Sequence, residues 1–138
     1  LGVDDAIEIY EYSKKYNMVR RCHVGEFETD KYVKDAIFKL DLNEIQHCLS
    51  GIKNDQVLNL IKEKNIKINL CPQTNLIFGV THNLYGPLRK LIDNDIQVSI
   101  NTDDLLIFDK TISQIFIDLY ATNKFDLDEL NKIRVNNL

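Results

Sequence analysis

Stretches with the two-residue period of a β-strand alternate along this sequence with stretches that have the period of an α-helix. The predicted strands occupy residues 18–23, 44–47, 66–70 and 96–100. Strands that alternate with helices usually pair in parallel, because each helix carries the chain back across the sheet. The sequence therefore predicts an α/β fold on one parallel sheet.

The intervening helices are predicted from apolar side chains that recur every three or four residues. The fullest stripe follows a cap at Thr29 or Asp30 and consists of Val33, Ala36, Ile37 and Leu40. Further helices are predicted to start at Asp4 or Asp5, with Ala6, Ile9 and Tyr10 on one face, and to cover residues 57–61, 87–92, 112–119 and 126–133. Asp126 and Glu129 have the spacing of a capping box for the last helix.

Four strand–helix units are half of the eight that close a (β/α)8 TIM barrel, which usually takes about 250 residues. With 138 residues the chain is long enough for one domain but short for a closed barrel. We therefore expect a partial (β/α)8 TIM barrel with parallel strands inside and helices outside. Such a piece leaves strand edges unpaired, so we expect it to associate with the missing part of the barrel or with itself.

Polar residues follow each predicted strand. The run from residue 96 to 100 ends in Asn101-Thr102-Asp103-Asp104, which a local Asx-type turn would explain as well as a functional site. The other strands end near His23 and Glu26, at His47, and at the turn of residues 71–75. Because parallel strands end at the same edge, these groups should converge there, where (β/α) barrels have their active sites.

The composition excludes some classes of protein. A net charge of −4 without a basic stripe argues against nucleic acid as the main partner. No apolar run approaches the roughly 20 residues of a membrane span, so a cytoplasmic protein without a membrane partner is expected. Cys22, Cys48 and Cys71 form no C-x-x-C pair and are expected to be small buried hydrophobes. His82, in the loop of residues 79–86, is expected to be exposed.

Four motifs at the ends of the predicted strands carry a family resemblance. They are His23-Val-Gly-Glu26, Glu-Ile-Gln-His47-Cys, Cys71-Pro-Gln-Thr-Asn and Ser-Ile-Asn-Thr-Asp103-Asp104. In this order, and separated by whole strand–helix units, they resemble the adenosine deaminase family over nearly the whole chain. The amino-terminal His-x-His of that family has no counterpart here. The resemblance therefore implies that residues 1–138 are the carboxyl-terminal half of such a barrel domain, about its last four units.

The resemblance also implies a metal-dependent reaction. His23 matches a histidine ligand of the family's zinc ion, and Asp103 matches its carboxylate ligand; nitrogen and oxygen ligands suit zinc. The implied function is hydrolytic deamination of adenosine, or a close purine nucleoside, to inosine and ammonia. Zinc would lower the pKa of its bound water and supply hydroxide for the attack on the purine carbon that bears the amino group.

Further roles follow from the same resemblance. Glu26 matches the proton donor to the purine ring nitrogen, so its pKa should be raised by burial and by the two aspartates. His47 matches the histidine that orients the water and helps deprotonate it. Asp104 matches the carboxylate that contacts the water and the purine base. Gly25 would let the backbone and the substrate approach closely.

Some residues depart from the family pattern and leave alternatives open. Gln46 and Cys48 flank the second histidine where small glycines are more usual, and Leu105 follows the aspartates where many members have proline. A related metal hydrolase acting on another aminopurine, such as adenine or adenylate, or on a cyclic amide is one alternative. A catalytically silent fragment is another. The other zinc deaminase class does not fit, because His23 and Glu26 are spaced H-x-x-E and no C-x-x-C follows.

Overall fold

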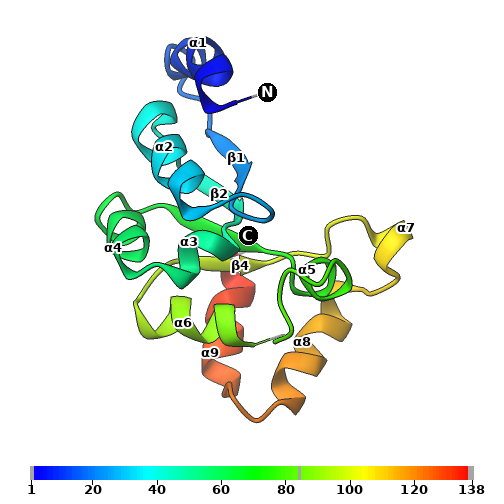
Figure 1. The fold of residues 1–138 in the computed structure, drawn as a ribbon. Helices are drawn as coiled ribbons and strands as arrows, with labels where there is room; N and C mark the ends of the chain where they lie inside the picture. The colour runs from blue at the N-terminus through cyan, green and yellow to red at the C-terminus, as the bar shows by residue number, and fades with distance from the viewer. Residues whose placement is uncertain (1, 84, 137–138) are drawn as a thin grey trace.

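The computed structural model describes residues 2–83 and 85–136 and contains one parallel sheet (Figure 1). Its strands are β1 (Arg21–Val24), β2 (Glu44–His47), β3 (Lys67–Leu70) and β4 (Val98–Ile100). Their order in the sheet is β1-β2-β3-β4, so each strand pairs with the next one along the chain. The α/β class and the parallel pairing predicted from the sequence are confirmed.

The helices connect these strands and follow the last one. They are α1 (Val3–Lys14), α2 (Asp30–Leu40), α3 (Leu49–Lys53), α4 (Asp55–Glu63), α5 (Pro72–Ile77), α6 (Gly86–Asp93), α7 (Leu105–Phe108), α8 (Ile112–Ala121) and α9 (Leu127–Val135). The predicted capping box of α9 is confirmed, because Glu129 N donates to Asp126 Oδ1 at 2.8 Å and Asp126 N donates to Glu129 Oε2 at 3.1 Å. Pro87 lies in the first turn of α6, as predicted.

Within the described part of the chain, no helix is both long and apolar enough to cross a membrane. The cytoplasmic location stays a prediction.

Several local predictions were wrong. Residues 18–20 precede β1 instead of belonging to it. Residues 71–75 do not form a simple turn, because α5 begins at Pro72, where a missing backbone N–H costs the helix nothing. In α1, Ile9 is 67% exposed, and Ile7 packs against the core in its place. The short helices α3 and α7 were not predicted, since five and four residues are too few to give an apolar stripe.

One face of the sheet builds the hydrophobic core with the helices. Ile45, Ile68 and Val98 point to this face and are almost completely buried, together with the predicted stripe of α2. Removal of this apolar surface from water is the main source of stability, at roughly 25 cal/mol per Å².

The opposite face of the sheet is polar. Hydrogen bonds join side chains of all four strands in a row: Arg21 Nε donates to Glu44 Oε2 at 2.8 Å, Asn69 Nδ2 donates to the same oxygen at 2.7 Å, and Ser99 Oγ donates to Asn69 Oδ1. Ser99 is the polar residue of the alternating pattern in β4, yet it is not exposed. Ser99 is 2% exposed because its hydroxyl is satisfied by Asn69.

Two helical isoleucines provide a test of this core. We expect Ile37→Ala in α2 to lower the free energy of unfolding by about 2–5 kcal/mol, because a 1% exposed side chain leaves a cavity when it is truncated. Ile9→Ala in α1 is the matched control, and it should change that free energy by less than about 0.5 kcal/mol. Urea unfolding of both variants measures the difference. Equal losses would contradict the assignment of α2 to the core.

Candidate active site

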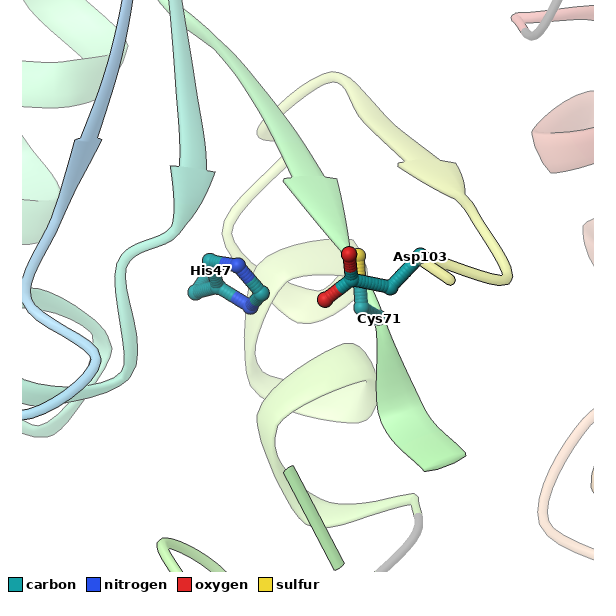
Figure 2. A group of neighbouring side chains, drawn as sticks. All are labelled: His47, Cys71 and Asp103. Atoms are coloured by element: carbon teal, nitrogen blue, oxygen red, sulfur yellow. The ribbon is translucent and has the colours of Figure 1, made fainter. Parts of the chain in front are cut away.

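The predicted functional residues lie at the carboxyl edge of the sheet. His23 is in β1, His47 ends β2, and their ring centroids are 5.5 Å apart. Donor atoms of His47, Cys71 and Asp103 all lie within 4.8 Å of one another (Figure 2). The side chains thus come from the ends of all four strands. The convergence that parallel pairing predicts is present in the fold.

Two of these residues adopt the left-handed backbone conformation, which is uncommon for side chains other than glycine. His47 has φ 63° and Asp103 has φ 60°. Strict strand alternation would put His47 on the helix-facing side with Ile45, because the two are two residues apart. The left-handed residue breaks this alternation and lets the imidazole face Cys71 and Asp103. Such local strain is typical of functional sites.

A buried amide connects the two candidate catalytic residues. Asn75 Nδ2 donates to Glu26 Oε1 at 3.0 Å and lies 3.1 Å from His47 Nδ1. Glu26 Oε1 and His47 Nδ1 are themselves 3.5 Å apart. Asn75 is 1% exposed, and it reaches the site from the first turns of α5. Sequence reasoning assigned this residue no role, although it noted the polar motif to which Asn75 belongs.

The surroundings shift the pKa of both groups. Burial raises the pKa of Glu26, the charge of Asp103 raises it further, and the hydrogen bond from Asn75 opposes both. The direction agrees with the prediction for a proton donor. Burial and the neighbouring His23 lower the pKa of His47. Near neutral pH the imidazole is therefore uncharged.

The hydrogen bonds also fix where the imidazole carries its proton. Because the Asn75 amide nitrogen is the donor, His47 Nδ1 accepts, and the proton of the neutral ring lies on Nε2. In this state His47 can orient an oxygen atom by donating from Nε2. Removing a proton from water would require the other tautomer.

Gly25 is required by packing within the chain itself. It has φ 80°, and a Cβ atom there would lie 2.6 Å from Val33 Cγ2 and 2.9 Å from Ser50 Oγ. The turn between β1 and Glu26 is thereby pressed against α2 and α3. The predicted approach of a substrate to Gly25 stays a prediction.

The adjacent aspartates have different surroundings. Asp104 is the N-cap of α7, where its Oδ1 accepts from Leu106 N at 3.0 Å and from Ile107 N at 3.3 Å. Asp103 is the one whose carboxylate lies with His47 and Cys71. The structure therefore separates the two neighbours, and it does not bring Asp104 into that group.

The three cysteines and His82 were also singled out in the sequence, and of these Cys71 lies in the site. Cys48 is fully buried and its sulfur faces Gly51, so its side chain does not narrow the candidate site. Cys22 is only half-buried, whereas Cys48 and Cys71 are buried as expected. His82 is exposed, as predicted; residue 84 of the same loop lies outside the described residues.

Replacement of Asn75 tests the hydrogen-bonded pair. We expect Asn75→Leu to raise the pKa of Glu26 further, because it removes the hydrogen bond that stabilises the carboxylate while keeping the branched shape of the side chain. Carbon-13 NMR titration of the carboxyl carbons, assigned with Glu26→Gln, measures this. Asn59→Leu on the exposed face of α4 is the control. A pKa that falls or stays constant in Asn75→Leu would refute this role.

The raised pKa of Glu26 predicts a pH dependence of the free energy of unfolding. Because the folded protein holds the Glu26 proton more tightly than the unfolded chain, it binds more protons at pH values above the ordinary pKa of 4.5. This contribution to stability therefore decreases as the pH rises through the interval between that value and the raised pKa. Glu26→Gln should remove this part of the pH dependence of unfolding.

Comparison with known proteins shows which family the chain resembles. The family model described as "Adenosine deaminase" matches residues 3–138. The adenosine deaminase of Plasmodium gallinaceum is 31% identical over 132 residues, which are 93% of this chain and 36% of that protein. The adenine deaminase of Psychrobacter cryohalolentis is 26% identical over 114 residues, 82% of this chain and 34% of that protein. The chain spans about a third of the length of these two relatives.

Solved structures agree on the fold. An adenine deaminase from Arthrobacter aurescens superposes with a TM-score of 0.88 at 20% identity over 98% of this chain and 42% of that one. An amidohydrolase from Burkholderia ambifaria, solved with bound Zn, has a TM-score of 0.79 at 18% identity over 94% of this chain and 37% of that one. The predicted partial (β/α)8 barrel is thus confirmed. Since the family model covers nearly every residue, the chain belongs to the adenosine deaminase family.

Proposed function

We propose that the protein is a metal-dependent hydrolase that deaminates an aminopurine, with adenosine as its main substrate and inosine and ammonia as products. The observation that carries this proposal is the pairing of Glu26 and His47 through Asn75, beside Asp103. We further propose that residues 1–138 form the carboxyl-terminal half of the barrel domain.

The donor set at the sheet edge fits a zinc ion. His23 and Asp103 offer a nitrogen and a carboxylate oxygen, both of which zinc accepts, and His23 lies beside the ring of His47. His23 is exposed and Asp103 is exposed, so both can be approached by ligands from elsewhere in the protein. A zinc ion held there would supply a nucleophile at neutral pH by acidifying water.

Residues of this chain would then donate a proton to the purine and position the attacking oxygen. Glu26, whose pKa is raised by burial and by the charge of Asp103, would in its protonated form donate a proton to a ring nitrogen of the purine. His47, neutral and with Nδ1 engaged by Asn75, holds the attacking oxygen by donating from Nε2. We assign to Asp104 a contact with the water and the base, which its second carboxylate oxygen would have to make while Oδ1 caps α7.

Parallel assays with adenosine, adenine and adenylate test the proposal, each following ammonia release by the zinc-loaded complex of this chain with the rest of the barrel. We expect the highest kcat/KM with adenosine. A higher value with adenine or adenylate would replace the substrate but keep the reaction; the similarity to an adenine deaminase makes this the second candidate. No turnover of any of the three would favour a catalytically silent protein.

The 138-residue chain by itself should not turn over adenosine. It offers His23 and Asp103 as ligands, with His47 nearby, whereas a catalytic zinc ion usually has three protein ligands and an open position. Self-association would repeat the same ligands without adding new ones. Zinc titration and an adenosine assay of the purified chain, before and after addition of the rest of the barrel, measure this. Full activity of the chain alone would refute the proposed ligand set.

A further inference from the structure

A cleft lies between α3 and α6, which contact each other (Figure 1). Its volume is about 340 Å³. Sites for small molecules usually have volumes of about 300–1,000 Å³, so the cleft is large enough for one. Of the described residues that line it, none has a role in the proposed deamination. The cleft is therefore a separate feature of the molecule.

The lining of the cleft is mostly apolar. Leu49 and Ile52 of α3 are buried members of the hydrophobic core that reach the cleft, and Val80 and Pro87 extend the apolar surface. A ligand with an apolar body would remove this surface from water, which is favourable.

Two lysines make the cleft positively charged. Lys53 ends α3 and forms no ion pair within the described part of the chain. Lys90 lies in the last turn of α6, and its Nζ is 2.8 Å from Asp55 Oδ1. Because the Asp55 side chain is 85% exposed, this ion pair contributes little and can be exchanged for a bound anion. No acidic residue is among the described residues that line the cleft, so its charge favours an anion.

Hydrogen bonds connect the cleft to the candidate active site. Val80 N and Thr81 N both donate to the backbone oxygen of Asn75, at 3.0 and 3.2 Å. The side chain of the same Asn75 bridges Glu26 and His47. A smaller void of about 10 Å³ is lined by Thr81, as the cleft is, and also by Asn75. A ligand that holds Val80 and Thr81 in place would therefore also hold Asn75 in place.

We propose that the cleft between α3 and α6 binds a small organic anion with an apolar body, and that the bound anion stabilises the bridge from Asn75 to Glu26 and His47. A ligand stabilises the state to which it binds, by an amount set by its concentration relative to its Kd. Since the cleft is present in the bridged arrangement, binding favours that arrangement. The proposal rests on the cleft and its hydrogen bonds, and not on the deamination.

Two related dyes test binding to the complete protein. 8-Anilinonaphthalene-1-sulfonate has an apolar body and one negative charge, and N-phenyl-1-naphthylamine has the same body without the sulfonate. Fluorescence titration measures the Kd of each dye. Val80→Phe fills the cleft and should weaken the binding of both dyes at least tenfold. Lys53→Gln should weaken the binding of the sulfonate about two- to fivefold and leave the neutral dye unchanged.

A second apolar groove, between α8 and α9, provides the matched control. Ile117→Phe in this groove should leave the Kd of both dyes unchanged. Circular dichroism of each variant verifies folding. Weaker binding in Ile117→Phe but not in Val80→Phe would place the dyes in the other groove and refute the proposal, as would a parent protein that does not bind the sulfonate. An equal effect of Lys53→Gln on both dyes would refute the preference for an anion.

Hydrogen exchange tests the connection to Asn75. The amides of Val80 and Thr81, which donate to the Asn75 oxygen, should exchange about tenfold more slowly when the sulfonate is present at ten times its Kd. The Leu130 amide of α9, a helix that does not line the cleft, is the control and should keep its rate. Unchanged exchange at Val80 and Thr81 with the sulfonate bound would refute the stabilisation of the bridge.

Discussion

Glu26→Gln should lower adenosine turnover by about 10²- to 10⁴-fold, the usual contribution of a general acid. The amide keeps the shape of the side chain, and its oxygen can still accept the hydrogen bond that Asn75 now donates to Glu26 Oε1. It has no carboxyl proton to donate to the purine. The substitution therefore removes the proton donor but keeps the hydrogen bond with Asn75. The variant should bind as much zinc as the parent protein.

Steady-state kinetics and metal analysis of the same preparation make this measurement. Glu63→Gln, on the exposed surface of α4, is the matched control and should have unchanged turnover. Turnover of Glu26→Gln within a factor of two of the parent protein would exclude Glu26 as the proton donor.

Asp103→Ala should have a comparably large effect for a different reason. Loss of residues that only support metal ligands already costs about 10- to 100-fold in metal affinity, so loss of a ligand should cost more. We expect Asp103→Ala to lose both zinc and turnover. The substitution also removes a charge that raises the pKa of Glu26.

Asp104 provides the control, if its substitution keeps the N-cap of α7. Asp104→Ala would remove the cap of α7 and cost about 1 kcal/mol, which would confuse the result. Asp104→Asn keeps a side-chain oxygen that can cap the helix but removes the charge. It should retain zinc and lose part of its turnover. Equal zinc loss in Asp103→Ala and Asp104→Asn would contradict the separate roles of the two aspartates.

The order of strands and helices could be predicted from the sequence because the spacing of apolar residues determines it. The stripe of α2 is long enough to distinguish a helix from a strand, and Ile45 and Ile68 lie in short runs that suit strands. The same reasoning failed where an element is short or its signal is ambiguous. Pro72 excludes a strand, but it starts a helix as readily as a turn, so α5 was missed.

The candidate site could be predicted only as a set of residues. That His23, His47 and Asp103 share an edge follows from parallel pairing. His47 and Asp103 adopt left-handed conformations that direct their side chains into the site. Histidine and aspartate are enriched in that conformation, but residue type alone does not say which of them adopt it. The bridge from Asn75 to Glu26 spans 49 positions along the chain and depends on how α5 leaves the sheet. The resemblance indicated which residues matter, and the fold was needed to see which of them touch.

The order of the strands has a consequence for how the chain folds. Every strand pairs with its successor, and the side chains that bond across the sheet are 23 to 30 positions apart in the sequence. Each closure therefore forms a loop of similar size, and the entropy lost depends only weakly on that size. Among the four strands of the described residues, no pairing has to wait for a distant segment. Assembly can begin at any strand–helix–strand unit and extend to its neighbours, as it does in repeat proteins, so synthesis on the ribosome can be accompanied by folding one unit at a time.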